Sequence, residues 1–232
     1  MKLNILPRFE ITLPVTKKSV KFRPFVMKEE KLLLMASESE DLNSILHALE
    51  ETVSACSFGE VTCDQYPLVD VQYLFLAIRG KSVSEQMEFN LVCGECRNAI
   101  PGTINVEDVK VQFHDNHNTK IKITEDVEVT MRYPQLKHLG ILSKEDASLD
   151  DIYDVVAECI QIIKTADEVY ESSNATLADM REFVDNLTAM QFAKLKEFFD
   201  TMPEITHTIK FTCLKCNTDN VIKMDEIANF FV

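Results

Sequence analysis

Apolar residues recur along the chain with two periods, one typical of strands and one typical of helices. They occupy every second position in residues 87–92 and 205–212, which predicts two half-buried strands. Each run leads into a Cys-x-x-Cys motif, a short polar turn and a return strand, at 102–106 and at 221–224. The sequence therefore predicts two β-hairpins, each with a pair of cysteines at its tip.

The cysteine pairs point to a metal. They are Cys93 with Cys96 in the first hairpin and Cys213 with Cys216 in the second. One such turn can place two thiolates on a metal ion, and two turns complete the closed four-coordinate shell of a structural zinc site. Because about half of the chain separates the motifs, their meeting at one shared zinc ion is a hypothesis that rests on cysteine spacing.

Two other interpretations of these cysteines stay open. A thioredoxin-like redox pair needs its motif at the start of a helix, whereas residues 99–102 turn the chain back toward a strand. Unligated or disulfide-bonded cysteines are the second alternative. The remaining cysteines, Cys56, Cys63 and Cys159, have apolar neighbours and are predicted to be small core residues.

Helical spacing of apolar residues predicts several helices. They are expected at 28–37, 42–56, 68–79, 149–164, 177–184, 189–202 and 225–231. Further short strands are expected at 9–13, 19–22, 109–113, 120–123 and 127–131. Gly80 is expected to end the third helix, and Thr188 with Gln191 to form a capping box before the helix at 189–202. The polar loop that contains His114 and His117 is interpreted as a surface turn.

These elements predict an α+β protein with zinc-ribbon-like cysteine turns on β-hairpins. Residues 1–132 form a mixed α/β part with the first cysteine turn, and residues 133–203 form a helical insertion. Residues 204–232 carry the second cysteine turn and a C-terminal helix, and complete the ribbon with 87–106. A zinc ion shared by both turns would join the two ends of this arrangement.

Composition narrows the class of partner. The 232 residues include 24 basic and 38 acidic side chains, a net charge of −14, which disfavours nucleic acid as the partner. Nothing at the N-terminus resembles a signal peptide, and no apolar run is long enough to cross a bilayer, so no membrane partner is expected. Seven cysteines without an export signal suggest a reducing compartment.

The sequence contains no recognisable catalytic motif. Its five glycines are too scattered for a dinucleotide-binding or phosphate-binding loop. Neither a G-x-S-x-G elbow nor an H-E-x-x-H helix occurs, and the histidines form no evident general base. We therefore expect a protein that is not an enzyme.

Two blocks, residues 22–35 and 70–85, resemble the signature blocks of the baseplate hub proteins of T4-like contractile-tailed bacteriophages. The paired Cys-x-x-Cys motifs fit the same family, and the similarity extends over the whole chain. The region before the second motif resembles the family only in its helical character. The resemblance implies a late, non-enzymatic tail morphogenesis protein. It would be a structural subunit or an assembly chaperone of the hub, in the host cytoplasm during assembly and in the virion tail baseplate.

Other baseplate hub or tail proteins are the partners that this resemblance implies, and no particular oligomeric state is predicted. Arg23, Phe25, Tyr73 and Arg79 are the candidate contact residues, because arginine and aromatic side chains dominate binding energy at interfaces.

The alternative function is a zinc-ribbon regulator that binds nucleic acid. It would require a basic patch around Arg79, Lys81 and Arg97 in the folded protein.

Overall fold

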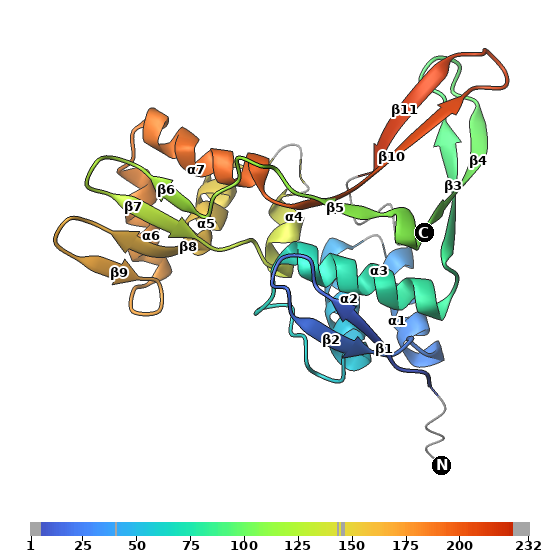
Figure 1. Ribbon diagram of the computed structural model, residues 1–232, viewed down its shortest axis with the longest axis horizontal. Helices are drawn as coiled ribbons and strands as arrows, with labels where there is room; N and C mark the ends of the chain where they lie inside the picture. The colour runs from blue at the N-terminus through green and yellow to red at the C-terminus, as the bar shows by residue number, and fades with distance from the viewer. Residues whose placement is uncertain (1–5, 40, 143, 145–146, 225–232) are drawn as a thin grey trace. The chain divides into compact units, whose positions relative to one another are not determined.

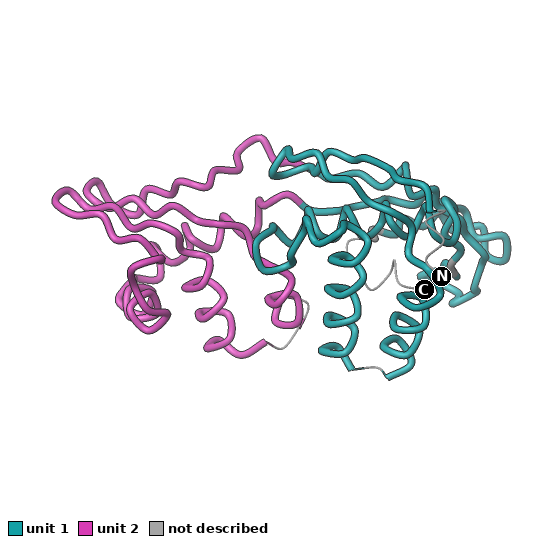
Figure 2. The backbone as a smooth tube through the Cα atoms, turned by 90° about the horizontal axis from the view of Figure 1, so that it is seen from below, with its two compact units in different colours: residues 1–112, 204–232 teal, residues 113–203 magenta. Residues whose placement is uncertain are grey.

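A computed structural model describes residues 6–39, 41–142, 144 and 147–224 (Figure 1). The chain forms two compact units (Figure 2). Unit 1 combines residues 1–112 with 204–232, and unit 2 consists of Phe113–Pro203, so unit 2 is inserted into unit 1. The fold is α+β, as predicted. The helix expected at 225–231 lies outside the described residues.

Unit 1 begins with an antiparallel hairpin and three helices, close to the predicted positions. They are β1 (Phe9–Thr12), β2 (Ser19–Phe22), α1 (Met27–Glu38), α2 (Leu42–Cys56) and α3 (Leu68–Ser82). The prediction that Gly80 ends the third helix is wrong, because α3 continues through Gly80 to Ser82. A Cβ atom at Gly80 would lie 3.3 Å from the Val106 side chain. Gly80 therefore permits close packing and does not act as a helix stop.

The rest of unit 1 consists of the two predicted cysteine-bearing hairpins and a short connection. Its elements are β3 (Gln86–Val92), β4 (Ala99–Asn105), the 3₁₀ helix η1 (Val106–Asp108), β5 (Lys110–Gln112), β10 (Glu204–Thr212) and β11 (Asp219–Met224). β3 pairs with β4 and β10 with β11, both antiparallel, and the hairpins run side by side (Figure 1). Their inner faces share a core with α3, in which Leu76, Met87, Ile104 and Ile205 are buried.

β5 also pairs with the base of β10, with Val111 opposite Ile205. This pairing, which the sequence pattern did not predict, joins the two chain segments at which unit 2 is inserted.

Unit 2 contains a four-stranded antiparallel sheet and several helices. The strand order is β6 (Lys120–Lys122), β7 (Glu128–Met131), β8 (Ile160–Lys164) and β9 (Val169–Glu171). The helical segments are η2 (Leu136–His138), α4 (Leu139–Leu142), α5 (Leu149–Cys159), α6 (Leu177–Asp185) and α7 (Ala189–Thr201). Unit 2 therefore starts at Phe113, ahead of residue 133 where composition placed the helical insertion, because β6 and β7 belong to the same sheet as β8 and β9.

The prediction of a long helix at 149–164 is wrong for its last five residues. The helix ends at Cys159, and 160–164 forms β8, in which Ile163 lies opposite Val129 of β7. β-branched isoleucines favour strands, and a short apolar run fits helical and strand periods equally well. The tertiary pairing with β7 decides between the two.

The core of unit 2 lies between the sheet and its helices. Val129 from the sheet and Leu195 with Phe198 from α7 are buried in it. The capping box of Thr188 and Gln191 is present. Cys56, Cys63 and Cys159 are buried as predicted. None of the helices in the described part of the chain is long and apolar enough to cross a membrane.

Candidate metal centre

The tips of the two long hairpins bring the four predicted cysteines together. The sulfur of Cys93 lies 3.6 Å from that of Cys216, and the sulfur of Cys96 lies 3.6 Å from that of Cys213. All four sulfur atoms are within 4.8 Å of one another. The two distant motifs therefore form one cluster that can hold a metal ion.

The two cysteine turns have the same backbone conformation. In the first, the N–H of Cys93 donates to the carbonyl five residues later at 3.0 Å, and the N–H of Arg97 donates back to the Cys93 carbonyl at 3.1 Å. The corresponding distances at Cys213 and Asn217 are 2.9 and 2.8 Å. Arg97 and Asn217 have positive φ angles of 55° and 56°, which reverse the chain after each pair of cysteines. Each turn thereby aims two sulfurs in the same direction.

One asparagine links the hairpins beside the cysteines. Asn220 lies on β11, and its amide nitrogen donates to the sulfur of Cys93 on the other hairpin, at 3.6 Å. Its amide oxygen accepts a hydrogen bond from the N–H of Gly94 at 3.0 Å. Asn220 thus fixes the first turn against the second hairpin, as residues around metal ligands commonly do.

Sequence inspection missed Asn220, although a signal exists. Asn220 is in phase with Ile222, whose side chain packs into the core between the hairpins, so it is a polar residue at a position where the strand pattern calls for an apolar one. The equivalent position of the first hairpin, counted from the cysteines, is Ile100. A lone polar residue on an inner strand face, close to a cysteine turn, therefore marks a side chain that hydrogen-bonds to the cysteines or to their turn.

Hydrogen bonds favour the thiolate form of two of the four cysteines. The backbone N–H of Cys96, together with further donors that include Asn220, lowers the pKa of Cys93 to about 6. The Thr218 hydroxyl, 3.3 Å from the sulfur of Cys216, lowers the pKa of that thiol.

The pKa of Cys96 changes in the opposite direction. The N–H of Asn98 favours its thiolate, but burial and the neighbouring sulfurs outweigh that hydrogen bond and raise the pKa to about 11. A cation that binds all four sulfurs must therefore displace protons, as metal binding to thiols generally does.

The donor set fits a tetrahedral thiolate site. Four sulfurs at about 2.3 Å from a central zinc ion lie about 3.8 Å apart, close to the two contacts of 3.6 Å. With four thiolates the shell is closed, which is the arrangement of structural sites rather than catalytic ones. The thioredoxin-like alternative does not match this geometry, because each motif leads into a strand, β4 or β11, and not into a helix.

The residues predicted to contact a partner lie elsewhere in unit 1. Arg23 is engaged internally: it donates to the buried carboxylate of Glu29 at 3.0 Å and lies 3.7 Å from the sulfur of Cys56. Phe25, Tyr73 and Arg79 are half-buried. Burial lowers the pKa of Arg79.

The basic residues that nucleic-acid binding would require lie on two different elements, Arg79 and Lys81 on α3 and Arg97 in the first cysteine turn. Lys81 is ion-paired with Glu85 just before β3 begins. Arg97 lies beyond the other end of that seven-residue strand, which by itself is about 23 Å long at the usual rise per residue.

His114 and His117 lie in a turn at the surface of unit 2, as predicted, and the half-buried ring of His117 packs back onto the unit. The ring nitrogens of His117 lie 3.0 Å from the hydroxyls of Thr201 and Tyr133, and its ring packs against Phe198. Burial lowers the pKa of His117, so the neutral ring is favoured. These contacts indicate a structural histidine.

A family model described as T4 bacteriophage base plate protein matches residues 6–232. The match covers nearly the whole chain, and the chain therefore belongs to this family of phage baseplate proteins. No curated protein and no solved structure matches the chain. The predicted resemblance to baseplate proteins is confirmed at this level, and the assignment to the hub stays a prediction.

Proposed function

We propose that this protein is a component or an assembly chaperone of the baseplate hub, and that it acts through contacts with other baseplate proteins and not as an enzyme. The observation that carries the proposal is the family match over residues 6–232. Both blocks that resemble hub proteins lie in unit 1, where residues 22–35 include most of α1 and residues 70–85 most of α3.

The surface of α1 supports a role in protein contacts. Met27, Leu34 and Met35 expose 73%, 57% and 59% of their surface. Met27 and Leu34 are two helical turns apart and therefore lie on the same side of α1, and exposed apolar side chains grouped in this way form a candidate surface for another protein. The net charge of −14 makes a protein partner more favourable than nucleic acid.

We further propose that the four cysteines bind one zinc ion with a structural role. Thiolate ligands and a closed shell of four suit zinc. When bound, the ion would hold the β3–β4 hairpin to the β10–β11 hairpin. These hairpins flank unit 2 in the sequence, with Cys93 and Cys96 before it and Cys213 and Cys216 after it. The bound ion would therefore hold together the two sequence segments of unit 1 that unit 2 separates.

Infection with a phage that encodes an affinity-tagged copy of the chain tests the proposed function. Mass spectrometry of purified tail intermediates and of finished virions would locate the protein, with an unrelated tagged phage protein as control. Presence in both fractions identifies a structural component, and presence in hub intermediates alone identifies an assembly chaperone. Absence from both would overturn the proposal.

The four candidate contact residues differ in how they can be tested. Replacement of Arg23 would remove the partner of the buried Glu29 and weaken the fold itself. Tyr73→Ala and Arg79→Ala are better tests, and we expect each to reduce recovery of hub proteins with the tagged chain while the circular dichroism spectrum is unchanged. Recovery equal to wild type would remove these residues from the proposed interface.

A further inference from the structure

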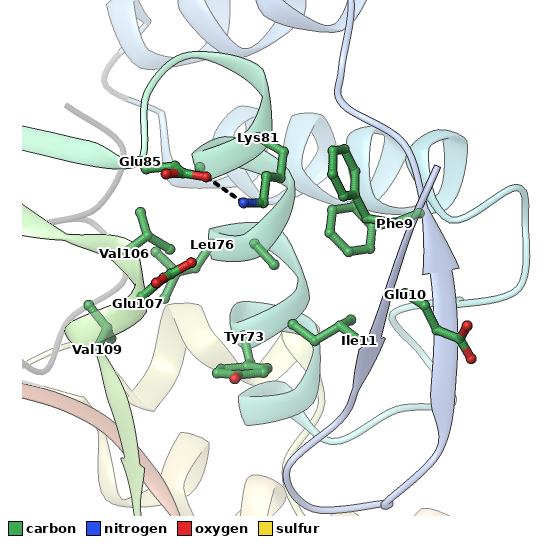
Figure 3. A pocket seen from close by; sticks show the side chains of 13 residues that line it. Phe9, Glu10, Ile11, Tyr73, Leu76, Lys81, Glu85, Val106, Glu107 and Val109 are labelled. Atoms are coloured by element: carbon green, nitrogen blue, oxygen red, sulfur yellow. Dashed lines mark hydrogen bonds and ion pairs between the residues drawn. The ribbon is translucent and has the colours of Figure 1, made fainter. Parts of the chain in front are cut away.

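Unit 1 contains an apolar cavity of about 190 Å³ between β1, α3 and η1 (Figure 3). Its walls are formed mainly by Phe9, Ile11, Leu76, Val106 and Val109. A buried apolar cavity of about 150 Å³ can take up benzene. The volume therefore suits one aromatic or branched aliphatic side chain.

Small residues of α3 keep this space open. Ala77 and Gly80 both line the cavity, and the side chain of Val106 already fills the space next to Gly80. A larger side chain at position 77 would occupy the volume without changing the helix. Ala77 is therefore the position at which the cavity can be closed by substitution.

Acidic side chains dominate one end of the cavity. Glu85 and Glu107 both lie near Lys81, which is ion-paired with Glu85. The hydrogen bond to Glu85 and the charge of Glu107 raise the pKa of Lys81. Two carboxylates against one ammonium leave one negative charge in excess at this end, where the Lys81 ammonium also lies 5.6 Å from the centre of the Phe9 ring. A second basic group can therefore be accommodated here.

The remaining carboxylate of the lining is turned away from the cavity. Glu10 accepts a hydrogen bond from the hydroxyl of Ser19 on β2, at 2.5 Å, and Figure 3 shows its carboxylate pointing away from α3. The excess negative charge therefore lies at the end formed by Glu85 and Glu107.

We propose that this cavity receives an aromatic or branched aliphatic side chain from a baseplate partner, in a segment with a lysine or arginine next to it. The apolar side chain fills the volume against α3, and the basic side chain lies beside Glu107. The inference rests on the proposed function and specifies its partner chemistry. Both blocks that resemble hub proteins contribute to the cavity, residues 22–35 through Phe22 and residues 70–85 through Tyr73 among others.

The protein contains no tryptophan, so the tryptophan fluorescence of a probe can be followed without tryptophan emission from the protein. The probe is a glycine-flanked Lys-Trp-Lys peptide with blocked ends, and the matched control peptide is Glu-Trp-Glu. We expect a saturable blue shift with the basic peptide and at least tenfold weaker binding of the acidic one. No saturable binding of the basic peptide up to millimolar concentration, or equal binding of both peptides, would overturn the inference.

Two variants locate the binding. Ala77→Phe, which fills the cavity, is expected to abolish the shift, and Glu107→Lys is expected to weaken binding at least tenfold. Glu60→Lys makes the same charge change at an exposed position outside the cavity and should bind like wild type. Circular dichroism checks that each variant is folded. Binding by Ala77→Phe equal to wild type, in a folded variant, would place the peptide elsewhere and contradict the inference.

The phage experiment separates this inference from the function on which it rests. If tagged wild-type protein reaches tail intermediates and Ala77→Phe does so equally well, the proposed function stands and the cavity is not the contact. If wild-type protein does not reach them, the proposed function itself fails, whatever the peptide result.

Discussion

The sulfurs of Cys93 and Cys216 lie 3.6 Å apart, although the two cysteines are 123 positions apart in the sequence. All of unit 2 lies within that loop. A link between such distant residues restricts the unfolded chain far more than a local one does. A metal ion at this point would therefore stabilise the association of the two sequence segments that form unit 1. Unit 2 has a core of its own.

Asn220 is expected to strengthen metal binding without contacting the metal. Asn220→Ala removes the hydrogen bonds to the sulfur of Cys93 and to the N–H of Gly94. Loss of such contacts typically weakens metal affinity about 10- to 100-fold. Competition with a chromogenic zinc chelator measures the change.

The matched control for this prediction is Asn90→Ala, since Asn90 is an exposed asparagine on β3. The control should leave zinc affinity within about twofold of wild type, because it removes no contact to a cysteine. Equal affinities for Asn220→Ala and Asn90→Ala would show that the asparagine bridge does not support the site.

The Arg23–Glu29 pair predicts a specific dependence of stability on pH. Burial alone would raise the pKa of Glu29, but the hydrogen bonds from Arg23 and from the N–H of Val26 outweigh it, so the pKa falls below its ordinary value of 4.5. A lowered folded-state pKa gives stability that is present above the ordinary value and is lost as the pH falls through the folded value. Glu29→Gln should therefore cost about 1–3 kcal/mol at neutral pH and less in acid.

Denaturant unfolding of metal-loaded wild type, Glu29→Gln and the exposed control Glu60→Gln, from about pH 6 to about pH 3, tests this prediction. Comparison with the control cancels the loss of zinc that acid itself causes. A difference between wild type and Glu29→Gln that stayed constant over this range would contradict the assigned pKa shift.

Phe198 is expected to be the main packing residue of unit 2. It is 1% exposed and lies in the core with Leu195 and Val129. Phe198→Ala should destabilise unit 2 by about 3–5 kcal/mol. Met190, on the same helix, is 83% exposed, and Met190→Ala should change stability by no more than about 0.5 kcal/mol.

Hydrogen exchange reports this effect in each unit separately. Faster exchange in β7 and β8 of Phe198→Ala, with β3 and β4 unchanged, is the expected result. Equal acceleration in all four strands would show that the two units unfold together and not independently.

Local sequence patterns predicted an element correctly where the local chemistry of the chain and its tertiary packing favour the same structure. The alternation that leads to Cys93 and Cys213 predicted both hairpins because one face of each strand is buried and the other is not. The capping box at Thr188 was predictable because its hydrogen bonds are formed within four residues of the helix start.

Features that depend on distant parts of the chain were not predictable in this way. Gly80 looked like a helix stop, but its role is set by Val106, which packs against it. Residues 160–164 looked helical, and their strand conformation is set by pairing with β7 and β9. The role of Asn220 likewise depends on a contact between two hairpins. In each case the deciding partner lies outside the sequence window that the pattern covers.

Elemental analysis of the purified protein is the most direct test of a single shared zinc site. We expect about one zinc per chain in wild type and in Cys63→Ala, which removes a buried cysteine outside the cluster. Cys213→Ser should lose the zinc, together with thermal stability of unit 1, because three thiolates leave the shell incomplete. Absence of zinc from wild type, or full zinc content in folded Cys213→Ser, would contradict a site shared by both hairpins.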